Sequence, residues 1–83
     1  IRTTAKFRKS FKRIPRDVMQ AACEREKIFR ENPFDGRLGT HKLHGKYGEY
    51  WTFTVKGQYR IMFAFADKDT IDFINIGTHE IYK

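Results

Sequence analysis

An 83-residue chain of 9.9 kDa has the size of one small domain, and we expect residues 1–83 to form it. Aromatic residues make up 16% of the chain, which excludes a disordered protein, and no apolar run is long enough to cross a membrane. The net charge of +7 predicts an anionic partner, and the single cysteine excludes an intrachain disulfide, which fits a reducing, cytoplasmic location.

The first predicted elements are a short edge strand and two helices. Residues 1–4 are rich in β-branched side chains and predict the strand. Phe7, Phe11 and Ile14 recur at i, i+4 and i+7, which is one face of a helix that Pro15 ends. Residues 16–31 predict a longer helix that stops at the Asn-Pro pair 32–33. Its buried stripe is expected to consist of Val18, Ala21, Ala22, Ile28 and Phe29.

The rest of the chain predicts strands, over residues 40–43, 50–55, 59–66 and 70–76. A hairpin turn over 56–58 joins the second and third of these strands. The predicted fold is α+β, with two N-terminal helices packed on one face of a mainly antiparallel sheet of four to five strands. The helices should cover Trp51, Phe53, Val55, Ile61, Phe63 and Phe65, whereas the other face carries Tyr50, Thr52, Thr54 and Arg60.

The cations are unevenly placed. Every charged residue among the first 16 is a cation, and Glu49 is the only acid between residues 37 and 60. Arg60 interrupts a strand that is otherwise apolar or aromatic, so its guanidinium requires an anion. Two interpretations stay open: a salt bridge to Glu49 or Asp72, or a fork that grips phosphate oxygens.

Titratable residues follow the last strand. His79 and Tyr82 lie in the tail after Gly77, and imidazole is the side chain best suited to proton transfer near neutrality. The alternative is that His79 is a surface histidine and that Tyr82 anchors the C-terminus.

A basic run formed by His41, Lys42, His44 and Lys46 is either a solvated loop or a phosphate track. Glu49 is the only carboxylate near it, which disfavours zinc, so we expect no metal and no cofactor. Tyr50 is the candidate ring for stacking a base, and Cys23 is expected to be a small packed residue.

The segments FRKSFKRIP, NPFD, THKLHGK, EYWTFTV, QYRIMFAF and IGTHEIYK, in this order, resemble the RelE/ParE superfamily of bacterial toxins. The similarity covers essentially the whole chain and is strongest to the RelE/StbE-type branch of YafQ/RelE-like mRNA interferases. It implies the α+β fold predicted above, a ribosome-dependent RNA endonuclease, and a small cognate antitoxin as the partner. No membrane or small-molecule cofactor is implied.

The resemblance also implies roles for single residues. Arg60 matches the arginine that binds the scissile phosphate, and Tyr82 matches a C-terminal aromatic residue. His79 lies where relatives have His or Arg after a glycine, and His41 where the YafQ branch has a histidine. Lys42 and Lys46 match a basic stretch of RelE. Thr54 and Gln58 replace a His and an Asp of the YafQ branch, so this site is a hybrid.

The mechanism expected from this set is metal-free attack of the ribose 2′-OH on its own 3′ phosphate. Arg60 holds the phosphate and His79 transfers a proton, with Tyr82 or His41 as its partner. Lys42, His44 and Lys46 hold adjacent phosphates, and Tyr50 stacks a base. Two alternatives stay open: a ParE-like inhibitor of DNA gyrase and a catalytically inactive, toxin-like binding module.

Overall fold

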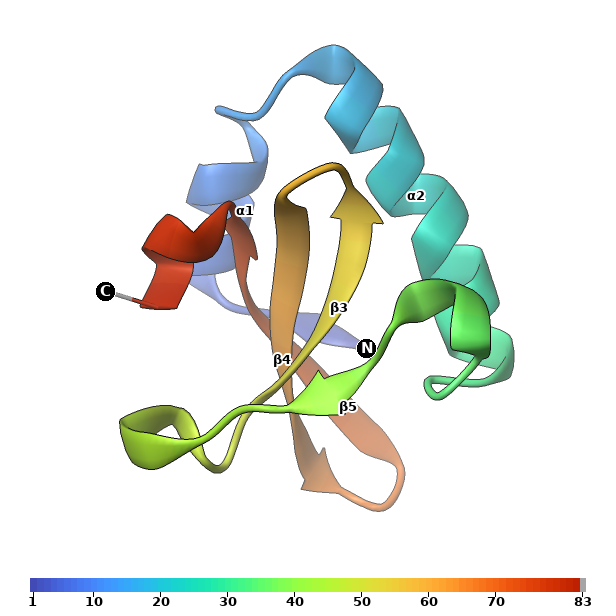
Figure 1. Cartoon of the computed structure of the whole chain (residues 1–83), viewed down its shortest axis with the longest axis vertical. Helices are drawn as coiled ribbons and strands as arrows, with labels where there is room; N and C mark the ends of the chain where they lie inside the picture. Colours follow the sequence, from blue (N-terminus) through green and yellow to red (C-terminus); the bar gives the residue numbers. More distant parts are fainter. Residues whose placement is uncertain (83) are drawn as a thin grey trace.

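A computed structural model describes residues 1–82 of the chain (Figure 1). Two helices pack against a five-stranded sheet, which confirms the predicted α+β fold. Within the described residues, no helix is long and apolar enough to span a bilayer. In chain order the elements are β1 (Arg2–Thr3), α1 (Ala5–Phe11), α2 (Arg16–Glu31), the 3₁₀ turn η1 (Gly36–Leu38), β2 (His41–Lys42), η2 (Gly45–Tyr47), β3 (Trp51–Lys56), β4 (Tyr59–Asp67), β5 (Thr70–Gly77) and η3 (His79–Tyr82).

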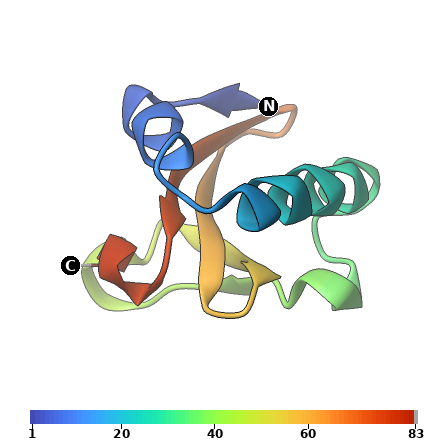
Figure 2. The same cartoon turned by 90° about the horizontal axis from the view of Figure 1, so that it is seen from above.

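The sheet has the strand order β1-β5-β4-β3-β2. The strands β2 to β5 pair antiparallel with their neighbours, whereas β1 runs parallel to β5, with Arg2 opposite Asp72 and Thr3 opposite Phe73. The first and last parts of the chain therefore lie side by side. Figure 2 shows both helices on one side of this strongly twisted sheet.

The core is aromatic and centres on Phe29 of α2. Its ring is fully buried and lies 4.9 Å from the rings of Phe53 and Phe63 and 5.4 Å from that of Phe73, measured between centroids. These three partners come from β3, β4 and β5, so one side chain of α2 joins three strands. Val18, Ala22 and Phe29 are buried and Ala21 and Ile28 pack beside them, which confirms the predicted stripe of α2.

The helix α1 begins at a side-chain cap. The Thr4 hydroxyl oxygen accepts a hydrogen bond from the backbone N–H of Phe7 (3.0 Å) and donates one to the carbonyl of Ile74 (2.7 Å). Thr4 thus fixes the start of α1 to β5. The helix ends at Phe11, before the predicted Ile14, which still packs against the core from the connection to α2.

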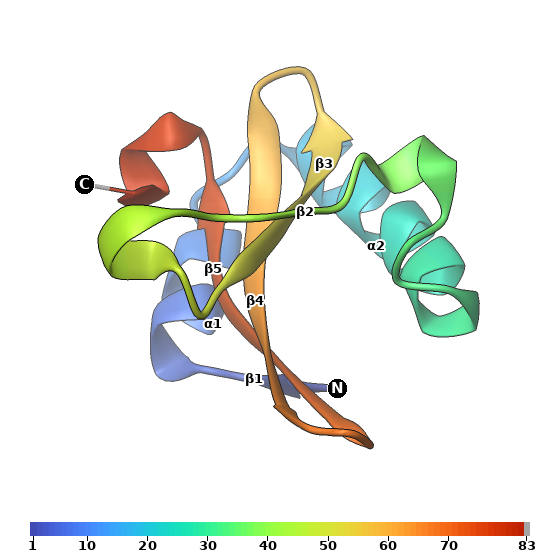
Figure 3. The same cartoon turned by 60° about the horizontal axis from the view of Figure 1, so that its bottom comes forward.

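The second face of the sheet is covered as well. Thr52 lies on the face opposite the helices, as predicted, and pairs there with Met62, but the two residues are only 1% and 4% exposed. The turns η2 and η3 fold back over this face, and Figure 3 shows β2 and η2 passing across it. The centre of the sheet is therefore buried on both sides.

Two predicted burials are wrong. Phe65 is 39% exposed because it lies beyond the helices, where its ring packs against those of Trp51 and Phe34. Cys23 is exposed on α2 rather than packed. Phe34, Trp51 and Phe65 form a small aromatic group at this end of the sheet, and Phe34 is 53% exposed.

Acid is expected to destabilise the fold. Asp35 accepts hydrogen bonds from the side chain and backbone of Arg37, which lowers the pKa of this carboxyl group from 3.8 to about 2. Hydrogen bonds from Lys56 and Arg2 likewise lower the pKa values of Asp17 and Asp72. A pKa below its unfolded value contributes stability that is complete above the unfolded pKa and is lost as the pH falls through the folded one.

The urea midpoint should therefore change little from neutral pH to about pH 5 and should fall between about pH 4 and pH 2. The variant D35N lacks the carboxyl group with the most strongly lowered pKa, so its urea midpoint should fall less over this pH range. An identical decline in D35N and wild type would contradict this assignment.

Candidate functional site

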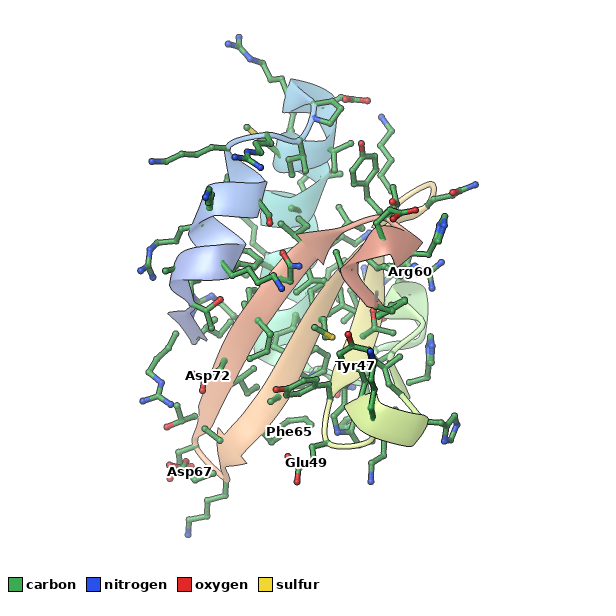
Figure 4. The ribbon with its side chains drawn as sticks, turned by 90° about the vertical axis from the view of Figure 1, so that its left-hand side faces the viewer. Tyr47, Glu49, Arg60, Phe65, Asp67 and Asp72 are labelled. Carbon is green, nitrogen blue, oxygen red and sulfur yellow. The ribbon has the colours of Figure 1, made fainter. Side chains whose placement is uncertain are left out.

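Arg60 lies near the start of β4, the central strand of the sheet, opposite Thr54 of β3 and Gly77 of β5. Its side chain is half-buried and belongs to the face opposite the helices. Within residues 1–82 its guanidinium makes no hydrogen bond and no ion pair. Of the two interpretations of Arg60, the salt bridge is therefore wrong: Asp72 binds Arg2 instead, at 2.7 Å, and Figure 4 shows Arg60 well apart from both Asp72 and Glu49.

The C-terminal turn η3 lies beside Arg60. Its last described residue, Tyr82, donates a hydrogen bond from its hydroxyl group to Thr52 Oγ1 (3.0 Å), so the tail is held against the second face of the sheet. His79 points to solvent, with its side chain 64% exposed and Nε2 3.3 Å from Glu80 Oε1. Because Gly77 pairs with Arg60 and precedes His79 by two residues, Arg60 and His79 lie at the same end of the sheet. No direct bond joins them among the described residues.

Gly77 permits the tail to pack this closely. A Cβ at this position would lie 2.8 Å from Ile81 Cγ2, which is closer than side chains tolerate. We therefore expect G77A to lower the free energy of unfolding by roughly 1–3 kcal/mol and to displace η3. Urea unfolding measures the first effect, and loss of the amide signal pattern of residues 79–82 in NMR spectra measures the second.

A matched control is available for this substitution. The same change at Gly36 meets nothing within 4 Å, so G36A should leave both readouts near wild type. The double variant G77A/I81A removes the clashing methyl group and should recover part of the stability. If G77A unfolds like wild type, the close contact does not hold the tail.

Three tyrosines form a cluster on this face: Tyr47, Tyr50 and Tyr82. The Tyr47 ring centroid lies 6.2 Å from that of Tyr50 and 6.3 Å from that of Tyr82, and the ammonium group of Lys46 lies 5.2 Å from the Tyr47 ring centroid. Tyr47 is thus the centre of the cluster, although sequence analysis selected only Tyr50 and Tyr82. The sequence feature that could have indicated Tyr47 is Gly45. Its φ of 68° starts the turn that folds Tyr47 back over the sheet.

The basic run forms an exposed rim around the cluster. His41 pairs with Thr52, the residue that Tyr82 contacts, so β2, β3 and η3 bring these three side chains to neighbouring positions. The His41 Nδ1 atom lies 3.0 Å from the carbonyl oxygen of Gly39, which can only accept, so Nδ1 is the donor and Nε2 is an acceptor when the ring is neutral.

Lys42, His44 and Lys46 are exposed, and none forms an ion pair within the described part of the chain. Lys46 lies at the tyrosine cluster, over the ring of Tyr47, whereas Lys42 lies opposite Trp51 in the β2–β3 ladder and so points to the other face of the sheet than His41. Such an arrangement can bind a polyanion along the rim and a single phosphate at Arg60. Within residues 1–82, no three His, Cys, Asp or Glu side chains form a group that could hold a metal ion.

Comparison with known proteins identifies solved structures that share this fold. No protein-family model and no curated protein sequence matches the chain. Solved structures do match: a chain of the RelB–RelE antitoxin–toxin complex of Methanococcus jannaschii has a TM-score of 0.79 at 22% identity, covering 100% of this chain and 96% of that one.

Two further structures match with comparable TM-scores. YafQ of E. coli has a TM-score of 0.81 at 15% identity and covers 98% of this chain and 93% of its own. The YoeB/ParE toxin of Agrobacterium tumefaciens has a TM-score of 0.79 at 15% identity, with 94% and 95% covered. The chain therefore has the fold of the RelE-superfamily toxins, as its resemblance to that superfamily implied.

Proposed function

We propose that this chain, which has the fold of RelE-superfamily toxins, is the toxin of a toxin–antitoxin pair and cleaves mRNA on the ribosome. Proteins with this fold occur in RelB–RelE and DinJ–YafQ complexes. The observation that carries the proposal is the half-buried Arg60 guanidinium, which has no partner among the described residues and lies beside a tail that bears His79 and Tyr82. An unneutralised guanidinium of this kind is suited to a phosphodiester.

The proposed reaction is an internal transesterification. The ribose 2′-oxygen forms a bond to its own 3′ phosphorus, the bond from phosphorus to the 5′-oxygen breaks, and the products are a 2′,3′-cyclic phosphate and a 5′-OH. A base takes the proton of the 2′-OH, and an acid gives one to the leaving 5′-oxygen. Arg60 stabilises the charge that develops on the phosphoryl oxygens.

The hydrogen bonds of the site favour histidines for both proton transfers. The Tyr82 hydroxyl already donates its proton to Thr52, and the bond must break before Tyr82 can act as the acid. His41 Nε2 is left as an acceptor by the contact of Nδ1 with Gly39, so His41 is the better candidate base. His79, which is exposed and lies at the same end of the sheet as Arg60, is then the candidate acid.

The rim supplies the binding path for RNA. Lys42, His44 and Lys46 bind phosphates on either side of the scissile bond, and the rings of Tyr47 and Tyr50 stack on a base. This part of the interaction depends on charge, so binding should weaken as salt is added.

The test is a translation reaction with purified ribosomes and one defined mRNA. Addition of the chain should produce cuts inside the translated region, and the new 5′ ends should accept phosphate from polynucleotide kinase without prior phosphatase treatment because they carry a 5′-OH. The same mRNA without ribosomes is the control. Intact mRNA in both reactions would contradict the proposal.

The likeness to a YoeB/ParE toxin favours one second candidate, a ParE-like inhibitor of DNA gyrase. A supercoiling assay with purified gyrase distinguishes the two targets. Inhibited gyrase with intact mRNA supports the second candidate, whereas an effect on neither target leaves a toxin-like binding module.

A further inference from the structure

A groove lies between α1 and the C-terminal turn, separate from the rim of basic residues. Its volume is about 360 Å³, and its walls include Lys6 and Ser10 of α1 and Arg13 of the turn after it on one side, and Thr78 and Ile81 on the other. The elements that form these walls lie together on the left of Figure 1. The RNA path proposed above uses none of these side chains.

One wall of the groove is cationic. Lys6, Ser10 and Arg13 are spaced i, i+4 and i+7, so they share one face of α1 and of the turn that follows it. In the part of the chain that the structure describes, Lys6 and Arg13 form neither a side-chain hydrogen bond nor an ion pair. No acid occurs in the first 16 residues to neutralise them.

The floor of the groove carries a hydrogen-bond donor. Asn75 is only 5% exposed, and its Oδ1 atom accepts a hydrogen bond from the backbone N–H of Ile76 (2.9 Å), which fixes the orientation of the amide. The NH₂ group makes no hydrogen bond within residues 1–82. Within these residues, every fully buried side-chain polar atom has a hydrogen-bond partner. The NH₂ group has none, so it is not fully buried and reaches the groove surface.

The groove also has an apolar part and one acid. Ile14, Tyr59, Ile76 and Ile81 line it beside the polar groups, and Glu80 stands on the tail side, in contact with His79. A bare chain of phosphates leaves such an apolar surface unused. A ligand that would use all of these groups has a carboxylate next to an aliphatic side chain. The carboxylate would bind the cations on the α1 wall and the buried amide donor, and the aliphatic side chain would pack on the apolar residues.

We propose that this groove binds an acidic, partly apolar peptide segment of a partner protein, with a carboxylate between Lys6 and Arg13 that accepts from the Asn75 amide. The identity of that partner as an antitoxin rests on the proposed function, whereas the chemistry of the groove does not. The charge of the chain complements such a segment.

The test uses the full chain and a short synthetic peptide of alternating Glu and Leu as the probe. Titration should shift the NMR amide signals of Ser10, Asn75 and Ile81. The variant K6E/R13E should bind at least about tenfold more weakly. The control K9E/K12E makes the same change of charge in the same segment, outside the groove, and should stay within about twofold of wild type. Circular dichroism confirms that both variants fold.

Three results would overturn the site. Equal loss of affinity in both double variants would mean that only the overall field of the protein attracts the peptide. An equally tight peptide of alternating Gln and Leu would remove the carboxylate from the proposal. Displacement of the probe by polyuridylate, with the same signals shifted, would make the groove a nucleic-acid track.

The two proposals fail in different assays. If wild type binds the probe in the groove but cuts no mRNA, the proposed function fails and the peptide site stands. If wild type cuts mRNA and the probe leaves the groove signals unchanged, the peptide site fails and the proposed function stands.

Discussion

The variant R60A is expected to cut mRNA on ribosomes roughly 10²–10³-fold more slowly than wild type, because it lacks the donor that stabilises the phosphoryl oxygens in the transition state. The fold should not suffer, since within residues 1–82 no carboxylate or other partner is left unpaired when this guanidinium is removed. Single-turnover cleavage of one mRNA, followed by primer extension, measures the effect.

Two further variants separate the role of Arg60 from charge alone. R60K keeps the positive charge but lacks the planar pair of donors, so we expect an intermediate rate. R16A removes one cation at the start of α2, on the helix side of the molecule, and should cleave at the wild-type rate. Cleavage by R60A as fast as by R16A would remove Arg60 from the reaction.

The variant F29A is expected to lose roughly 3–5 kcal/mol of unfolding free energy. Phe29 is fully buried and its ring contacts Phe53, Phe63 and Phe73, so alanine leaves a cavity that three strands border. Small domains have only about 5–15 kcal/mol of stability in total, so a large fraction of F29A molecules should be unfolded at 37 °C. Urea unfolding followed by circular dichroism measures the loss.

Phe34 provides the matched control for this prediction. F34A makes the same substitution three residues beyond the end of α2, where the side chain is 53% exposed and touches only the rings of Trp51 and Phe65 among aromatic groups. We expect it to cost less than half as much as F29A. Equal losses of unfolding free energy in F34A and F29A would mean that Phe29 is not the centre of the core.

The sequence predicted those parts of the fold that depend on local signals. The bounds of α2 follow from an apolar stripe between Pro15 and the Asn-Pro pair at 32–33, and the structure confirms them. The β3–β4 hairpin follows from two alternating runs around Gly57, whose φ is 56°. Both signals lie within a few residues of the element that they define.

The features that the sequence did not predict depend on contacts between distant segments. Alternation separates the two faces of a strand but does not say what covers the second face, so the burial of Thr52 and Met62 under η2 and η3 was missed. The same limit applies to Phe65, because its exposure depends on how far the helices reach over the sheet.

The residues of the candidate site were likewise predicted where the signal is local and missed where it depends on distant contacts. Arg60 was identified because a charge inside an apolar strand stands out in the sequence itself. The sequence offered Tyr82 as an anchor of the C-terminus, but its partner Thr52 lies 30 positions away and was not predicted. Tyr47 was not selected, because its central place depends on the turn at Gly45 rather than on any periodicity.

The parallel pairing of β1 with β5 has a consequence for biosynthesis. Residues 2 and 3 pair with residues 72 and 73, and Thr4 hydrogen-bonds to Ile74, so the N-terminal segment cannot complete its contacts until residues 72–74 have left the ribosome. A nascent chain whose residues 72–74 are still held in the exit tunnel should therefore lack a finished sheet. We expect protease digestion of stalled nascent chains to find protection only when the stall point places residue 74 outside the tunnel, so that the sheet forms late and in one step.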